Sequence, residues 1–316
     1  MSRVIAIMYN LTPEQRAAVE SAAAGRVTIE FLESDKPAKE LLNNAEALIG
    51  RVLPEYLSEA PNLKWVQTTF AGVERIVPLL KNRDVLLSNA SGAFGEGLSD
   101  HMLGQMLALI TRVPEYLNNQ RKHEWKFLGT VKSIRSLTVT VVGFGDIGSA
   151  FARKVKALGA TVRGVKRFSS DKPDYVDELF LTEDLDAALD GADVVALSLP
   201  STPETIGMIS RERIFAMKPG TIILNIGRGS AIDQEALIDA LKEKHILAGL
   251  DVTTPEPLPA DNPLWDLEGV IITPHISGVA SAALTRKYLA ELIANNVASY
   301  LDGTQLENLV DIGLGY

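Results

Sequence analysis

The sequence predicts an α/β fold of two domains, each built on a parallel sheet. Short apolar, β-branched runs alternate with helical patterns from end to end of the 316 residues. Strand–helix alternation of this kind is typical of parallel sheets. Five runs precede residue 95 and six follow residue 137, with a long helical stretch between the two groups. Two sheets joined by a helical connector are the simplest architecture that fits this order.

The first group of runs predicts strands that are buried on both faces, because the runs are nearly continuous in apolar residues. A capping box at Thr12-Pro13-Glu14-Gln15, with proline in the first turn, opens the first helix. The connector helix spans about 97–122 and is interrupted at Pro114. The first-group strands are expected at 4–9, 27–32, 47–50, 63–69 and 85–89.

The second group continues the same pattern to the last helix, expected over about 279–302 and ending near Gly303. The tail beyond it is mildly apolar, and we expect it to pack back onto the first domain. The predicted domains are therefore 1–98 together with 285–316, and 99–284. The second-group strands are expected at 138–143, 161–165, 193–199, 221–227, 247–252 and 270–275.

Composition narrows the class of protein. The net charge of −9 argues against a general nucleic-acid-binding surface. The chain has no cysteine, which excludes disulfides, thiol catalysis and thiolate metal ligands, and no metal site is predicted. No stretch of about 18 uncharged apolar residues predicts a membrane span, and the N-terminus does not resemble a signal peptide. We expect a cytoplasmic protein that binds neither membrane nor nucleic acid.

A glycine-rich loop follows the apolar strand TVTVV and opens a helix, which is the setting of a dinucleotide site. The first glycine permits the tight turn, the second lets backbone approach a pyrophosphate, and the third allows close packing of strand and helix. The alternative is a glycine-rich turn without a ligand. The loop residues are Gly143, Phe144, Gly145, Asp146, Ile147 and Gly148.

The next strand ends at Lys166-Arg167, where NAD-specific folds usually carry an acid that binds the ribose 2′-hydroxyl. A carboxylate would repel a 2′-phosphate, whereas a guanidinium binds it bidentately. Ser169 and Ser170 add hydroxyl donors. The reversal of charge at this position favours NADP(H), with NAD(H) as the alternative cofactor. The alternative interpretation of Lys166 and Arg167 is that both are solvated charges at a strand end.

His275 is the strongest of the four histidines as an acid–base group. It lies just beyond an apolar strand, where ligands bind in open α/β sheets. His245 precedes a strand, His123 lies in a charged segment, and His101 has no obvious partner near the start of the connector helix. A lone histidine is usually structural, so the assignment depends on polar residues at equivalent strand ends.

Two such residues are present. Glu256 follows strand 247–252, and a carboxylate beside an imidazole favours the protonated ring and fixes its orientation. Arg228 stands between two glycines after strand 221–227, and its planar fork suits a substrate carboxylate and the neighbouring keto oxygen. The alternative for Glu256 is an acid on a surface loop, and the alternative for Arg228 is a turn arginine in a weak surface ion pair. A histidine so placed protonates a carbonyl oxygen as hydride reaches carbon.

These motifs together resemble the D-isomer-specific 2-hydroxyacid dehydrogenase family, and the similarity is strongest over 89–284. The resemblance implies a doubly wound cofactor domain and a flavodoxin-like substrate domain, both Rossmann-like, with the active site in the cleft between them. It also implies a homodimer paired mainly through the cofactor domain. The further motifs that carry it are 199–205, 217–220, 225–229, 251–257, 262–265 and 273–275.

By this resemblance, His275 is the acid–base group, Glu256 its partner and Arg228 the ligand of the substrate carboxylate and carbonyl. The loop Phe70-Ala71-Gly72-Val73 corresponds to the one whose N–H groups bind the carboxylate, so Ala71 and Gly72 are predicted substrate ligands. Asp251 corresponds to an acid near the nicotinamide carboxamide. The same motifs add the cofactor-binding positions Pro200, Thr205, Ile226, Gly227, Asp251, His275 and Gly278.

Two departures from the family pattern qualify the prediction. The basic pair Lys166-Arg167 resembles the NADPH-dependent glyoxylate and hydroxypyruvate reductase branch. Asp100 stands where many members carry glutamate, and the shorter side chain could shift a hinge or cleft contact. Arg51 and Trp125 are candidates to reach the cleft. The alternative interpretation is a surface charge for Arg51 and an interdomain packing residue for Trp125.

We therefore expect an oxidoreductase that transfers hydride between NADP(H) and a small 2-keto or D-2-hydroxy acid. Two alternatives stay open. One is a non-catalytic dinucleotide sensor of the corepressor type. The other is a phosphite- or formate-type dehydrogenase on the same fold, although formate enzymes carry glutamine at the position of Glu256.

Overall fold

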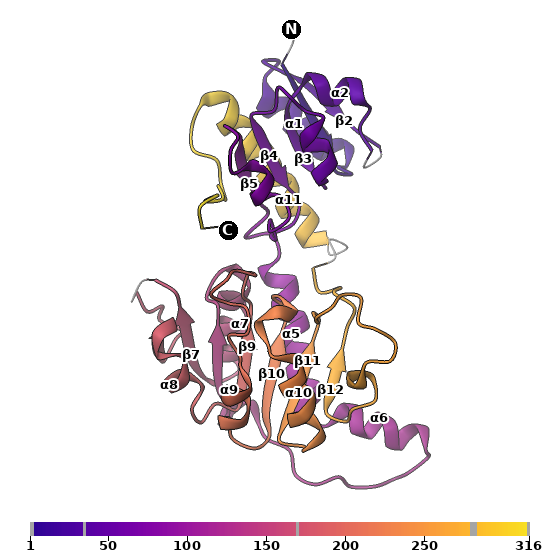
Figure 1. Cartoon of the computed structure of the whole chain (residues 1–316), viewed down its shortest axis with the longest axis vertical. Coiled ribbons are helices and arrows are strands. Elements are labelled where there is room, and N and C mark those ends of the chain that lie inside the picture. The colour runs from indigo at the N-terminus through magenta and orange to yellow at the C-terminus, as the bar shows by residue number, and fades with distance from the viewer. Residues whose placement is uncertain (1–2, 34–35, 169–170, 279–282, 315–316) are drawn as a thin grey trace. The chain divides into compact units, whose positions relative to one another are not determined.

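The computed structural model describes residues 3–33, 36–168, 171–278 and 283–314 (Figure 1). The chain divides into two compact units, Met1–Ala93 with Ala280–Tyr316, and Phe94–Val279. Each boundary lies a few residues before the position expected from the sequence. The C-terminal segment belongs to the first unit.

The described part of the first unit contains a five-stranded parallel sheet in the order β2-β1-β3-β4-β5. This is the order of the flavodoxin-like fold. The strands are β1 (Val4–Met8), β2 (Thr28–Phe31), β3 (Ala45–Gly50), β4 (Trp65–Thr68) and β5 (Leu86–Ser88). The helices are α1 (Pro13–Ala23), α2 (Lys39–Asn44), α3 (Pro54–Ser58), α4 (Val77–Leu80) and α11 (Ala283–Asp302).

Alternation along β1 explains the two layers of this unit. Ile5 and Ile7 pack in one core with side chains of α1 and α11, whereas Ala6 and Met8 pack in another with side chains of α2, α3 and α4. Successive side chains of a strand point to opposite faces, so a run apolar at every position is covered on both sides. The predicted capping box opens α1, because Thr12 Oγ1 accepts the Gln15 N–H and Gln15 Oε1 accepts the Thr12 N–H.

The described part of the second unit contains a seven-stranded parallel sheet in the order β12-β11-β10-β9-β6-β7-β8. Strand order reverses between β6 and β9, and such a switch point is where doubly wound sheets bind ligands. The strands are β6 (Thr138–Val142), β7 (Thr161–Lys166), β8 (Glu178–Leu181), β9 (Val194–Leu197), β10 (Thr221–Asn225), β11 (Ile246–Leu250) and β12 (Val270–Ile272). Strand β8 was not predicted.

Helices cover both faces of this sheet. Side chains of α8, α9 and α10 form one core with the strands, and α5 packs on β10, β11 and α7. The predicted helical stretch is two helices that break at Arg112, whose φ of 62° is left-handed, and Pro114 lies in the first turn of the second helix. The helices are α5 (Gly95–Ile110), α6 (Val113–Arg121), α7 (Asp146–Ala157), α8 (Leu185–Leu189), α9 (Arg211–Ala216) and α10 (Gln234–Lys242). Among the residues described, no helix combines the length and apolarity that crossing a bilayer requires.

Candidate active site

The glycine-rich loop joins β6 to α7 at the carboxyl edge of the seven-stranded sheet. Gly143 has a φ of 92°, and a Cβ there would lie 2.8 Å from the Ser198 carbonyl oxygen. A Cβ on Gly148 would lie 2.0 Å from the Gly143 carbonyl oxygen, so the fold itself requires both glycines. In contrast, a Cβ on Gly145 would meet no described atom within 4 Å. The open space at Gly145, directly before a helix N-terminus, fits the close approach of a pyrophosphate.

Side chains of the loop turn toward the protein. Phe144 stacks on Tyr175 with 6.2 Å between ring centroids. Asp146 fills the space beside Gly95, where a Cβ would lie 2.2 Å from its Oδ1. Ile147 is half-buried. The loop therefore offers mainly backbone groups to a ligand.

The basic pair follows the neighbouring strand. Lys166 is the last residue of β7, and Arg167 follows it. The Lys166 ammonium lies 5.8 Å from the Phe144 ring centroid, and Arg167 Nη2 lies 3.6 Å from Glu204 Oε1. Since β7 pairs with β6, the basic pair and the glycine loop share one edge of the sheet. Ser169 and Ser170, the predicted hydroxyl donors, lie outside the described residues.

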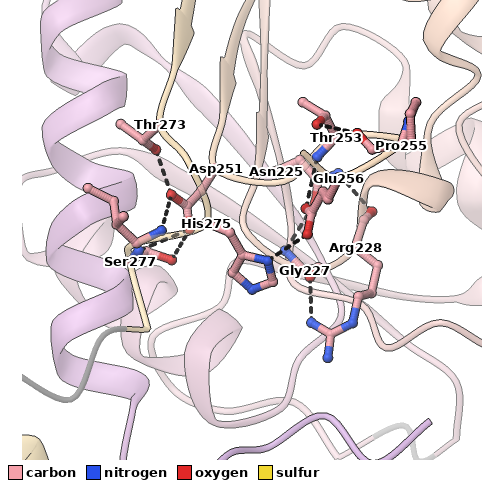
Figure 2. Close-up of polar contacts among 11 residues, drawn as sticks. Asn225, Gly227, Arg228, Asp251, Thr253, Pro255, Glu256, Thr273, His275 and Ser277 are labelled. Atoms are coloured by element: carbon pink, nitrogen blue, oxygen red, sulfur yellow. Dashed lines mark hydrogen bonds and ion pairs between the residues drawn. The ribbon is translucent and has the colours of Figure 1, made fainter. Parts of the chain in front are cut away.

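His275 and Glu256 form a direct hydrogen-bonded pair, with 2.9 Å between Nδ1 and Oε2 (Figure 2). They come from the loops after β12 and β11, which are adjacent strands. The other carboxylate oxygen of Glu256 accepts the Thr253 N–H at 3.1 Å, which fixes the plane of the carboxylate. The two side chains are 49% and 38% exposed. With Nδ1 held by Glu256, Nε2 is the ring nitrogen left to meet a ligand.

The backbone of His275 is held in an unusual conformation. Its φ of 51° is left-handed, which costs a residue with a side chain roughly 1–2 kcal/mol. Its N–H donates to the carbonyl oxygens of Asp251 at 2.9 Å and Thr273 at 3.0 Å. Non-glycine residues in this region mark positions that the surrounding structure over-determines.

Asp251 holds the backbone around His275 in this conformation. Its carboxylate is buried and accepts hydrogen bonds from Thr273 Oγ1 (2.6 Å), the Ile276 N–H (3.0 Å), the Ser277 N–H (3.0 Å) and Ser277 Oγ. Burial by itself raises the pKa of Asp251, but the Ser277, Thr273 and backbone hydrogen bonds outweigh it and lower the pKa below its ordinary value. One ionised carboxylate thus ties both flanks of His275 to the end of β11.

A polar cluster on α5 supports the same loop. His101 Nε2 lies 3.1 Å from Thr273 Oγ1 and 3.8 Å from Asp251 Oδ1. Gln105 Nε2 donates to Thr273 Oγ1 at 3.3 Å. The sequence offers no obvious partner for His101, because its partners lie more than a hundred residues away, directly after β11 and β12.

Arg228 follows β10, the next strand of the sheet. A Cβ on Gly229 would lie 2.2 Å from the Thr253 carbonyl oxygen, and one on Gly227 would lie 2.6 Å from backbone atoms of the loop after β9. The two glycines therefore let three loops approach closely. Figure 2 shows the Arg228 guanidinium and the His275 imidazole extending toward the same side of these loops. Arg228 is half-buried, and its Nη1 donates to the Gly227 carbonyl oxygen at 2.8 Å.

The other predicted cofactor positions lie beyond the same carboxyl ends. Thr205 closes the turn after β9, since its hydroxyl donates to the Pro200 carbonyl oxygen at 2.7 Å and accepts the Thr202 N–H at 2.8 Å. Ile226 is buried directly after β10, and Gly278 follows the His275 loop. Loops after β6, β7, β9, β10, β11 and β12 thus contribute to one edge.

The predicted carboxylate loop of the first unit follows β4. Thr68 Oγ1 donates to the Phe70 carbonyl oxygen at 2.6 Å, and Asn89 Nδ2 donates to the Ala71 carbonyl oxygen at 3.0 Å. Within the described ranges, the N–H groups of Ala71 and Gly72 donate to no protein acceptor. These two N–H groups can therefore donate to a ligand.

Three further predicted positions have simpler surroundings. Asp100 Oδ1 accepts a hydrogen bond from Lys154 Nζ at 2.6 Å, so the shorter acid joins α5 to α7. Arg51 is exposed. Trp125 is 106% exposed.

The chain matches the family model described as "D-isomer specific 2-hydroxyacid dehydrogenase, NAD binding domain" over residues 103–277. It is 34% identical to the D-3-phosphoglycerate dehydrogenase of Mycobacterium tuberculosis over 99% of this chain, and it spans 59% of that relative's length. It is 33% identical to glyoxylate/hydroxypyruvate reductase B of Pectobacterium atrosepticum, over 89% of both chains.

Solved structures show the same fold. A D-isomer specific 2-hydroxyacid dehydrogenase from Xanthobacter autotrophicus, in complex with NADPH and MES, superposes with a TM-score of 0.84 at 28% identity, covering 100% of this chain and 99% of that one. An NADPH-dependent glyoxylate/hydroxypyruvate reductase from Sinorhizobium meliloti, in complex with NADP and sulfate, gives 0.83 at 27% identity over 100% of both chains. The family model covers more than half of this chain. The chain therefore belongs to the D-isomer specific 2-hydroxyacid dehydrogenases, a family of NAD(P)-binding oxidoreductases.

Proposed function

We propose that this enzyme reduces a small 2-keto acid, of the glyoxylate or hydroxypyruvate type, to the D-2-hydroxy acid with NADPH. The observation that carries the proposal is the 2.9 Å hydrogen bond between His275 Nδ1 and Glu256 Oε2 at the carboxyl edge of a dinucleotide-binding sheet. When bound, the nicotinamide supplies the hydride that is added to C2 of the keto acid. The protein must then supply a proton to the carbonyl oxygen.

His275 is the proposed proton donor. Glu256 accepts the hydrogen bond from Nδ1–H and stabilises the imidazolium, so that Nε2–H is available to the substrate oxygen. In the reverse direction the neutral ring accepts that proton. Positioned general acids of this kind contribute about 10²–10⁴-fold to rate.

Arg228 and the Ala71–Gly72 amides are the proposed ligands of the substrate carboxylate. Arginine offers two parallel N–H groups to a carboxylate and polarises the adjacent keto oxygen. Asn89 and Thr68 hold the carbonyl groups of the loop in the first unit, which supports a role for its amides as donors. The same carboxylate requirement applies to every 2-keto acid, so these residues do not distinguish substrates.

The cofactor-binding residues proposed are the glycine loop, Lys166, Arg167 and the loops after β9 to β12. The open approach at Gly145 fits a pyrophosphate, and the basic pair fits a 2′-phosphate. The relatives solved with NADPH and NADP support this preference, with NAD(H) as the weaker cofactor.

We also propose a homodimer formed through the second unit. Figure 1 shows α6 and the segment after it extending away from the seven-stranded sheet. This arm exposes large apolar side chains, which water-facing surfaces rarely gather without a partner. They are Val113, Leu117, Trp125, Phe127 and Val131. Light scattering should report a dimer, and Trp125→Ser with Phe127→Ser should yield monomers. A monomeric parent protein would contradict this part of the proposal.

The experiment that tests the function follows oxidation of NADPH and NADH against a panel of 2-keto acids. The panel contains glyoxylate, hydroxypyruvate, pyruvate and bulkier 2-keto acids, with 3-phosphohydroxypyruvate included because of the mycobacterial relative. We expect the highest kcat/KM with NADPH and glyoxylate or hydroxypyruvate. Binding of NADPH without oxidation by any keto acid would instead favour a sensor, and phosphite or formate oxidation would favour that alternative.

A further inference from the structure

One ion pair crosses the carboxyl end of β6, the strand that leads into the glycine loop. Strands β7 and β9 pair with β6 on its two sides. Arg167 follows β7 and Glu204 lies in the loop after β9, and Arg167 Nη2 is 3.6 Å from Glu204 Oε1. A carboxylate from one flank of the glycine loop therefore contacts the guanidinium on the other flank.

Glu204 is held in its charged form and on a defined turn. The Thr202 hydroxyl and a backbone N–H lower the pKa of Glu204, with a smaller contribution from the Arg167 charge. The Thr205 hydroxyl closes the turn by its bonds to Thr202 and Pro200. At neutral pH the Glu204 carboxylate therefore places a negative charge next to the Arg167 guanidinium.

The ion pair is weak enough to exchange. The Arg167 and Glu204 side chains are 37% and 57% exposed, and exposed pairs contribute little stability. The Arg167 guanidinium also lies 4.9 Å from the Phe168 ring centroid, which helps to hold it when its anion changes. A phosphate dianion offers a bidentate, doubly charged replacement for one carboxylate.

We propose that Glu204 is a specificity-determining residue that competes with the 2′-phosphate of NADP(H) for Arg167. This inference rests on the proposed assignment of Arg167 to that phosphate. Occupation of Arg167 by Glu204 lowers affinity for NADP(H), and the carboxylate repels the phosphate after exchange. NAD(H), which has no 2′-phosphate, is unaffected. The residue therefore narrows the preference that the basic pair creates.

The test is binding of defined probes to the intact protein with Glu204→Gln, measured by titration calorimetry. The probes are NADPH, NADH, adenosine 2′,5′-bisphosphate and 5′-AMP. The variant should bind NADPH and the bisphosphate about three- to tenfold more tightly, as expected for removing one screened like charge. Dissociation constants for NADH and 5′-AMP should stay within about twofold, and added salt should shrink the gain.

Two variants make the outcome specific. Glu178→Gln removes the acid of the comparable Arg163–Glu178 pair, 3.4 Å apart at the far end of β7, and should change no probe. Arg167→Ala should weaken NADPH and the bisphosphate but not NADH. If Arg167→Ala behaves so and Glu204→Gln does not tighten NADPH, the role of Glu204 is overturned and the cofactor assignment stands. If Arg167→Ala weakens all four probes equally or none, the cofactor assignment itself fails, and the role of Glu204 with it.

Discussion

Asp251→Asn should loosen the loop that positions His275 while leaving the sheet intact. The carboxylate accepts two hydrogen bonds at each oxygen, from Thr273 and Ile276 on one side and from Ser277 on the other. An asparagine can accept at only one of these atoms, so its NH₂ group faces one backbone N–H that it cannot satisfy and one hydroxyl that must turn to accept. Each buried donor left without an acceptor costs about 1–3 kcal/mol. We expect the loop to open more easily by about 2–4 kcal/mol.

Amide hydrogen exchange measures this opening directly. Since about 1.4 kcal/mol is a tenfold change, exchange at Ile276 and Ser277 should accelerate roughly 30- to 1000-fold. Protection of β6, at 138–142, should not change. Asp233→Asn is the matched control, because Asp233 caps α10 through the Ala236 N–H at 3.0 Å and asparagine caps equally well. Unchanged exchange at 276–277 in Asp251→Asn would refute the assignment of Asp251 as the anchor of this loop.

Two further predictions follow from the second unit. Gly145→Ala should leave the melting temperature unchanged but weaken NADPH binding at least tenfold, as measured by calorimetry. Gly148→Ala should lower the melting temperature, because its Cβ would lie 2.0 Å from the Gly143 carbonyl oxygen. An equal loss of stability in the two variants would contradict the assignment of Gly145 to ligand binding and Gly148 to the fold. Burial raises the pKa of Asp193, but Lys132, the Thr138 N–H and Lys218 outweigh it and lower the pKa below its ordinary value. The lowered pKa of Asp193 in the folded protein contributes stability at pH values above the unfolded pKa of about 3.9, and this stability is lost as pH falls through the folded pKa. Asp193→Asn should therefore reduce the slope of unfolding free energy against pH below about 4, measured by urea titration. An unchanged slope would contradict the role assigned to Asp193.

The fold was predictable because the buried strands are visible in the sequence as short, mainly apolar runs. Runs such as 138–143 and 221–227 consist mainly of β-branched and other apolar residues, which is typical of strands covered on both faces. Strand β8 (Glu178–Leu181) escaped prediction because it lies at the edge of the sheet and is at most half-buried. Its four residues contain one acid and no β-branched residue, so they form no strong pattern.

The candidate site was predictable as far as strand ends carry polar residues. The His275 and Glu256 positions follow adjacent strands of one parallel sheet, so their proximity follows from topology once the order is known. The contact of His101 with Thr273 depends instead on how α5 packs against β11, and the hydrogen bonds of Asp251 depend on how the loop after β12 folds. A single sequence contains no periodicity that reports such a tertiary contact.

We propose that His275, oriented by Glu256, delivers the proton in an NADPH-linked reduction. The most direct test is the kcat of His275→Gln with the preferred keto acid, alongside NADPH binding measured by calorimetry. His123→Gln, a change at an exposed histidine after α6, serves as the control. We expect His275→Gln to lose about 10²–10⁴-fold in kcat while binding NADPH within a few-fold of the parent. A variant that keeps more than a tenth of the parent kcat would contradict it.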